Sequence, residues 1–120
     1  MRAMIKRFDS KVVVENIDGG LSNLQDIVGG FIEVPYIGKE FSNKGIDVIV
    51  NDSGMIDGLD ASIILLDESG VVGALFGQVI FVSHDKAEFC DLTDEQIDFL
   101  NSRMTIVMDS EGKIYEALYI

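Results

Sequence analysis

The chain has few of the residues that mark several common classes of protein. Its 120 residues include one cysteine, one proline, one histidine and no tryptophan. The single cysteine, Cys90, excludes a disulfide within the chain, which is typical of proteins from a reducing compartment. Lys and Arg number 9 against 21 Asp and Glu, so the formal net charge is −12. Direct binding to nucleic acid or to an anionic membrane is therefore disfavoured, because both need clustered cations.

No apolar run is long enough to cross a bilayer as a helix. The longest, residues 71–82, is interrupted by two glycines and a glutamine, and a spanning helix needs about 20 apolar residues. The first residues carry positive charge but are not followed by the apolar segment of a secretory signal. We therefore expect a cytoplasmic protein.

The chain does contain enough apolar material for one core. Hydrophobic residues make up 48% and charged residues 25%, the balance of a folded globular protein, and 120 residues are too few for two independent cores. We predict one compact domain over residues 1–120. Its class is α+β, with a mainly antiparallel sheet and two short helices on one face of that sheet.

Alternation of residue types and turn signals place the strands. Residues 71–83 are predicted as one central strand, buried on both faces, because they are almost entirely apolar. A kink is expected in it near Gly73 or Gly77. Residues 38–46 are predicted as a polar loop. The other predicted strands cover residues 4–8, 11–17, 31–37, 47–51 and 55–59, a strand or single helical turn covers 61–66, and a C-terminal β-hairpin extension covers 105–120.

The first helix is predicted over residues 21–28, where apolar side chains recur at i, i+3 and i+7. Ser22 and Gln25 have the spacing of a capping box. Gly19-Gly20 and Gly29-Gly30 flank the segment and are expected to delimit the helix through positive φ angles. The other interpretation of these glycine pairs is a backbone cradle for a phosphate.

The second helix is predicted from Thr93 onward. Thr93 is the expected N-cap and Gln96, three residues later, completes a capping box. Ile97, Leu100 and Met104 recur on one face and are expected to be its buried side.

The single histidine suggests one catalytic and one metal-binding arrangement. His84 and Cys90 could form a base and nucleophile, but no glycine-rich oxyanion element accompanies them. His84, Asp85, Glu88, Cys90 and Asp91 lie within eight residues, yet structural zinc needs four Cys or His ligands and only two are present. We therefore predict no enzymatic activity, no metal and no cofactor.

Carboxylates concentrated near the second helix are the most distinctive feature of the sequence. The whole net charge of −12 lies in residues 45–120, and six carboxylates fall within fourteen residues, opposed there only by Lys86. Such a run is either a solvated surface or a docking face for a Lys/Arg-rich protein. The candidate partner-binding residues are Asp85, Glu88, Asp91, Asp94, Glu95 and Asp98.

Several motifs resemble a known family. They are IDGGLxxLQxxVGGxIE at 17–33, VIVNDSG at 48–54, GL at 58–59, GxxxxQVIFV at 73–82 and LTDEQI at 92–97. Together they resemble a family of small uncharacterised proteins, a domain of unknown function, found in phages and mobile elements of Gram-positive bacteria. The resemblance covers roughly residues 3–101. It implies a phage or mobile-element accessory protein that acts in the bacterial cytoplasm.

These observations lead to two hypotheses about function. The first is a non-enzymatic protein that binds a basic host protein, for example inhibiting a defence or nucleic-acid enzyme, with its acidic face replacing the phosphate backbone. The alternative is a small-ligand binder, such as a sponge for a nucleotide immune signal, that uses the glycine-rich turns. The sequence leaves the oligomeric state open, and a homodimer is compatible with it.

Overall fold

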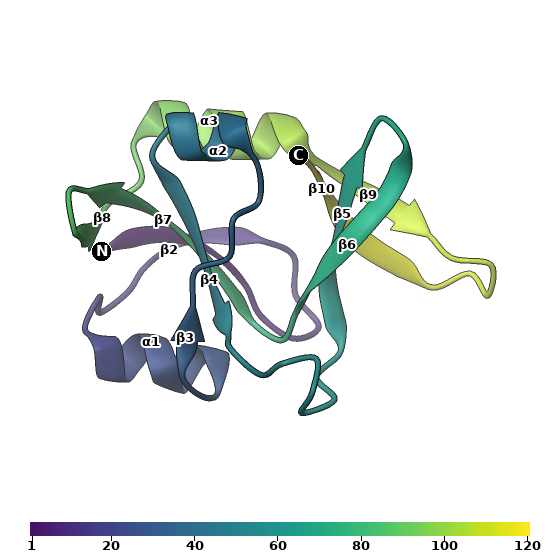
Figure 1. Cartoon of the computed structure of the whole chain (residues 1–120), viewed down its shortest axis with the longest axis horizontal. Coiled ribbons are helices and arrows are strands. Elements are labelled where there is room, and N and C mark those ends of the chain that lie inside the picture. The colour runs from purple at the N-terminus through teal and green to yellow at the C-terminus, as the bar shows by residue number, and fades with distance from the viewer.

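The computed structural model describes all residues of the chain, 1–120, and contains ten strands and three helices (Figure 1). The strands are β1 (Arg2–Lys6), β2 (Val13–Asn16), β3 (Ile32–Glu33), β4 (Ile46–Asn51), β5 (Ala61–Asp67), β6 (Gly70–Phe76), β7 (Val79–Asp85), β8 (Glu88–Cys90), β9 (Met104–Met108) and β10 (Ile114–Tyr119). The helices are α1 (Leu21–Val28), α2 (Lys39–Asn43) and α3 (Asp94–Arg103). None of the three helices is long and apolar enough to cross a membrane.

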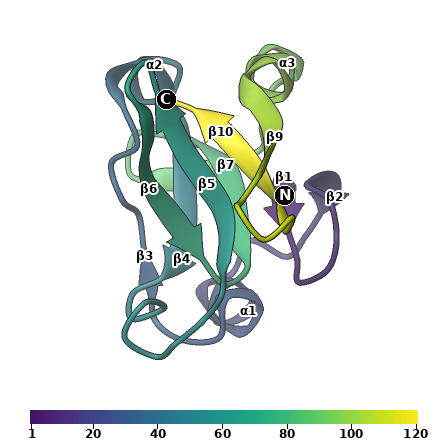
Figure 2. The ribbon, with the colours of Figure 1, turned by 90° about the vertical axis from the view of Figure 1, so that its right-hand side faces the viewer.

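The strands form two sheets. The first has the order β2-β1-β7-β4-β3, with β8 also paired to β7, and the second has the order β6-β5-β10-β9. Figure 2 shows the second sheet with its strands side by side. Every pairing is antiparallel except that of β10 with β5. With a radius of gyration of 13.6 Å, the molecule has the compactness of one domain. The predicted α+β class, mainly antiparallel and in one domain, is confirmed.

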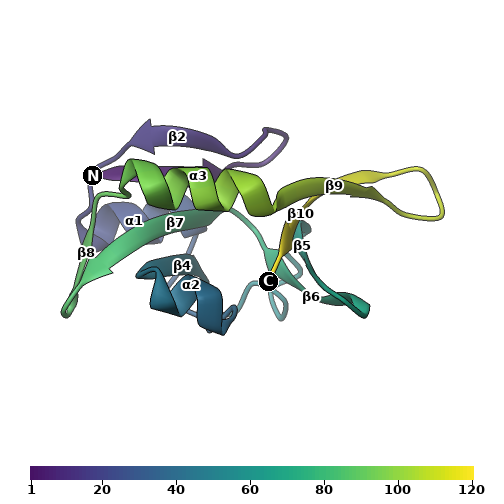
Figure 3. The same cartoon turned by 90° about the horizontal axis from the view of Figure 1, so that it is seen from above.

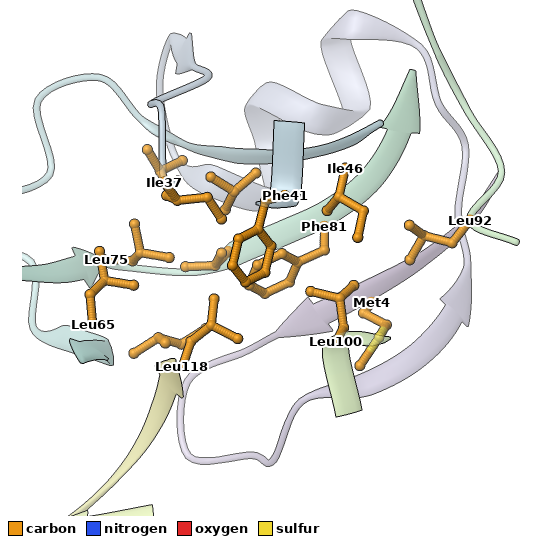
Figure 4. Packing of buried hydrophobic residues seen from close by; sticks show 14 residues of the cluster. Met4, Ile37, Phe41, Ile46, Leu65, Leu75, Phe81, Leu92, Leu100 and Leu118 are labelled. Atoms are coloured by element: carbon orange, nitrogen blue, oxygen red, sulfur yellow. The ribbon is translucent and has the colours of Figure 1, made fainter. Parts of the chain in front are cut away.

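The central strands of the first sheet, β1, β4 and β7, are buried on both faces. Successive side chains of a strand point in opposite directions. On β7, Ile80 and Val82 pack with Leu24 of α1, whereas Phe81 belongs to the larger core on the other face. That core lies between the two sheets and is closed by α2 and α3. In Figure 4 the side chains of Phe41, Phe81, Leu100 and Leu118 converge from α2, β7, α3 and β10.

The prediction that both helices lie on one face of a single sheet is therefore wrong. Helix α1 covers one face of the first sheet, and α3 packs into the core on its other face. Periodicity identifies which side of a helix is buried, but it does not identify the face of the sheet that receives it.

The prediction of one long strand over residues 71–83 is also wrong. The segment divides into β6 and β7, which belong to different sheets. The chain turns at Gly77, where φ is +74° and a Cβ would lie 2.8 Å from Cδ1 of Leu59. Glycine adopts this angle without strain, whereas a residue with a Cβ would be strained and would also displace the Leu59 side chain. The apolar composition was the same on both sides of this turn because both strands contribute to the core.

Two further segments differ from their predictions. Residues 39–43 form α2 rather than a loop, and the helix buries Phe41, its one large apolar side chain. Residues 55–59, expected to be a return strand, contain no strand, and residues 55–58 form turns. The strand expected over 31–37 contracts to β3 at the edge of the first sheet, with Pro35 beyond its end. This edge position is compatible with the nearby proline, because proline in sheets is confined to edge strands, strand starts and bulges.

The predicted C-terminal hairpin is present as β9 and β10. The carboxylate of Asp109 organises its turn by accepting the backbone N–H groups of Glu111 and Lys113, at 2.9 and 3.0 Å. Strand β10 lies between β9 and β5 in the second sheet. The hairpin therefore completes that sheet and also projects beyond it, at the end of α3 that is farther from β8 (Figure 3).

Candidate functional site

The six predicted partner-binding carboxylates all lie at exposed positions. They come from the end of β7, from β8 and its link to α3, and from the first turns of α3. Figure 1 places β8 and the start of α3 at one end of the molecule, opposite the β9–β10 hairpin. We call this set the acidic end; its members are Asp85, Glu88, Asp91, Asp94, Glu95 and Asp98.

Local structure explains how these carboxylates come together. Asp85 and Glu88 are paired across the tight β7–β8 connection, whose Lys86 has a φ of +57°. In α3, Asp94 and Glu95 occupy the first turn, where the helix dipole stabilises negative charge.

The predicted cap of α3 is confirmed and fixes where the helix starts. The Thr93 hydroxyl oxygen accepts the N–H of Gln96 at 3.1 Å, and the side-chain oxygen of Gln96 accepts the N–H of Thr93 at 2.9 Å. The amide nitrogen of Gln96 also donates to the carbonyl of Lys44 at 2.7 Å and to the hydroxyl of Ser83 at 2.9 Å. The cap thus ties the acidic end to the segment before β4 and to β7.

Sequence reasoning missed Arg2, the main cation of the acidic end. Its backbone N–H donates to a carboxylate oxygen of Asp91 at 2.9 Å. Its guanidinium donates twice to the carbonyl of Leu92, at 2.9 and 2.7 Å, and lies 3.0 Å from a carboxylate oxygen of Asp94. No local signal could have placed Arg2 here, because 89 residues separate it from Asp91.

The acidic end therefore contains two kinds of carboxylate. Asp91 and Asp94 are engaged by Arg2, whereas the other four make no hydrogen bond and no ion pair within the chain. Only the second group can bind cations from outside without first losing an internal partner. Its members are Asp85, Glu88, Glu95 and Asp98.

The structure does not bring His84 and Cys90 together as a pair. In the β7–β8 ladder His84 is opposite Phe89, and Cys90 is opposite Ser83, so the two side chains leave opposite faces of the ribbon. Nδ1 of His84 instead lies 3.0 Å from a carboxylate oxygen of Asp47. No three His, Cys, Asp or Glu side chains gather in an arrangement that could hold a metal ion.

The glycine pairs have structural roles at the two ends of α1. Gly29 ends the helix with a φ of +81°, and a Cβ on Gly30 would lie 2.8 Å from the side-chain nitrogen of buried Asn51. Gly20 is the N-cap, with a φ of −65° and no side-chain cap. The expected positive φ is thus confirmed at Gly29 and wrong at Gly20, and the capping box expected from Ser22 is absent.

The Gly29-Gly30 pair lacks the cations that commonly assist phosphate binding. The hollow beside Gly29 and Gly30 contains the carboxylate of Asp26 and no Lys or Arg. It also lies at the C-terminal end of α1, where the helix dipole is unfavourable for an anion. A larger open groove of about 570 Å³ lies elsewhere, between the β1–β2 turn and the hairpin, and it includes Lys6 and Lys11.

Comparison with known proteins gives one match. The sequence profile of the Domain of unknown function (DUF3846) matches residues 1–105. The chain belongs to this family. Its matched region includes all of the acidic end and stops just after β9 begins, so that β10 lies outside it. Neither the curated proteins nor the solved structures contain a match to the chain.

Proposed function

We propose that this DUF3846 protein is a non-enzymatic binding protein that docks a basic partner through its acidic end. The supporting observation is the group of four exposed carboxylates without internal partners, gathered at one end of a molecule of net charge −12. Like charges repel one another, and a Lys/Arg-rich surface would relieve this repulsion. Complementary charge also accelerates the encounter of two proteins.

The proposal extends to the kind of partner. The resemblance of the sequence motifs to proteins of phages and mobile elements favours a role inside a bacterial host. A host defence or nucleic-acid enzyme has a basic groove for phosphates, and the acidic end would occupy that groove as a substitute for the nucleic acid. The expected consequence is inhibition of the host enzyme.

The test removes the charge of the four carboxylates without internal partners. The variant combines Asp85→Asn, Glu88→Gln, Glu95→Gln and Asp98→Asn. Tagged protein is used to capture partners from bacterial lysate at low and high salt, with quantitative identification of what is retained. We expect wild-type protein to retain a basic protein at low salt and to lose it at high salt, because salt screens exposed charges. The variant should retain much less of it at low salt.

A matched control separates the position of the charge from its amount. The control variant makes the same change in net charge at exposed carboxylates outside the acidic end, namely Asp52→Asn, Asp60→Asn, Glu68→Gln and Glu111→Gln. It should retain the partner as wild-type protein does. If both variants lose the partner equally, net charge rather than the acidic end governs binding, and the proposal is wrong.

The small-ligand alternative has a separate readout. A nucleotide that binds the folded state raises the melting temperature, by mass action, when its concentration exceeds Kd. A thermal-shift screen with linear and cyclic nucleotides would show such a rise in wild-type protein. A rise that persists in the acidic-end variant, together with no captured partner, would favour the ligand hypothesis.

A further inference from the structure

We infer that two copies of this chain associate by pairing their β9 strands edge to edge. Strand β9 is the last strand of the second sheet, so one side of its backbone has no partner strand. Its sequence, MTIVM, contains no charge and no proline, which are two of the devices by which natural proteins protect a sheet edge. The side chains of Ile106 and Met108 are 67% and 68% exposed.

The hairpin geometry shows which backbone groups face outward. The N–H of Asp109 donates to the carbonyl of Lys113, across the hairpin. Backbone groups alternate in direction along a strand, so those of Val107 also point toward β10 and those of Ile106 and Met108 point away. The N–H of Met104 is already bonded to carbonyls of α3. Ile106 therefore lies at the centre of the open edge.

The sequence around Ile106 is complementary to itself in the antiparallel direction. A two-fold axis between two Ile106 residues places Met104 opposite Met108 of the second copy and Thr105 opposite Val107. Apolar and β-branched pairs stabilise neighbouring strands. The same register satisfies all of these pairs, and a second copy is the partner that provides it.

The other edge of the second sheet is less suited to this pairing. Strand β6 is also uncharged, and Val71 is 68% exposed. However, its pairing with β5 has two register shifts, and irregularities of this kind twist an edge away from a flat approach. The β9–β10 register is continuous over all five pairs, from Ile114–Met108 to Leu118–Met104.

The distribution of charge also favours β9. Two molecules of net charge −12 repel each other, and the repulsion is smallest when their acidic regions are far apart. The acidic end lies opposite the hairpin (Figures 1 and 3). Pairing through β9 therefore joins the molecules at an uncharged edge and leaves both acidic ends at the outside.

The first test is the oligomeric state of two matched lysine variants. Wild-type protein should sediment as a dimer that dissociates on dilution. Ile106→Lys should be monomeric, because it places two ammonium groups opposite each other on the axis, and its melting temperature measured at a concentration where wild-type protein is monomeric should be unchanged. Val71→Lys makes the same change at an equally exposed position of β6 and should remain a dimer.

The second test measures the register by cross-linking, in a Cys90→Ala background with diamide as the oxidant. Ile106→Cys places two thiols opposite each other with Cα atoms about 5.5 Å apart, which is within disulfide reach. Met108→Cys, equally exposed on the same strand, places them roughly 13 Å apart. The first variant should form a covalent dimer readily and the second should not.

Several results would overturn the inference. A wild-type protein that is monomeric at every accessible concentration would do so. A dimer that survives Ile106→Lys, or that dissociates with Val71→Lys, would place the contact elsewhere. Faster cross-linking through Met108→Cys than through Ile106→Cys would exclude the proposed register. None of these results depends on whether the acidic end binds a partner.

Discussion

At the scale of single residues, Arg2 has the largest effect on the shape of the candidate site. It is the second residue of the chain, yet it bonds the carbonyl of Leu92 and contacts Asp91 and Asp94. It therefore attaches the segment that leads into α3 to β1, in the first sheet. Without it, the acidic end would have no guanidinium and the start of α3 would lose a tether.

We predict that Arg2→Ala lowers the free energy of unfolding by about 1–3 kcal/mol, because hydrogen bonds that involve a charged group are lost. Asp94→Asn is the control. The Asp94 side chain is 87% exposed, and an exposed ion pair contributes at most about 1 kcal/mol. Urea unfolding of both variants checks the prediction. An Arg2→Ala variant that is no less stable than Asp94→Asn would mean that the bonds to Leu92 contribute nothing measurable.

Residues with purely local roles were the ones that sequence could predict. Thr93 and Gln96 form their capping box within four residues, and Gly29 ends a helix that its own neighbours define. Arg2, the pairing of His84 with Asp47 and the packing of Gly30 against Asn51 all join distant segments. No local pattern in the sequence shows which distant segments the fold brings into contact.

At the scale of elements, α3 links the core to the candidate site. Its first turn carries Asp94 and Glu95, whereas Leu100 is completely buried in the larger core. Ile97 and Met104, predicted on the same face, are partly buried against that core. The position of the acidic end therefore depends on the cap and on the buried face of the same helix.

We predict that the N-cap of α3 contributes less to the free energy of unfolding than the buried face of the same helix. Thr93→Ala should cost about 1 kcal/mol through loss of the N-cap, and Leu100→Ala about 2–5 kcal/mol through the cavity that it leaves. Ser102→Ala, at an exposed position, is the control and should have little effect on the denaturant midpoint. If Leu100→Ala leaves the midpoint unchanged, the assignment of the buried face is incorrect.

The elements that sequence misplaced have no local signal for their neighbours. The sequence does not separate β6 from β7, because an apolar run has the same composition whether it stays in one sheet or enters a second. Helix α2 is five residues long, too short for its periodicity to be distinctive. By contrast, the predicted bounds of α1 and of the C-terminal hairpin are nearly correct. The residues that end α1 and those that form the hairpin turn are adjacent in the sequence to the elements that they define.

At the scale of the whole molecule, two regions at opposite ends have different chemistry. The acidic end carries exposed charge, and the β9 edge carries exposed apolar groups. If both proposals hold, a dimer would present two acidic ends pointing away from each other. Such a molecule could bind two basic sites at once, with an avidity set by the distance between them.

The boundary of the family match also has a structural consequence. Residues 1–105 match the family profile, but β10 lies outside this region and occupies an inner position of the second sheet. Ala117 and Leu118 are completely buried. Strand β5 pairs with β10 along residues 63–66. In this protein, residues beyond the matched region are therefore part of the core.

We predict that a chain truncated after residue 105 does not fold cooperatively. The truncation removes β10, leaves one side of β5 without a partner and exposes Ile63 and Leu65, which are buried in the full chain. Loss of a cooperative thermal transition by circular dichroism would be the expected result. Adding a peptide of residues 106–120 should restore the transition, because the peptide provides the missing strand in trans.

A milder control replaces only the turn residues 110–112 and keeps every strand pair, so it should melt close to wild-type protein. A truncated chain that melts as sharply as the full one would show that the first sheet and its helices are stable without the second.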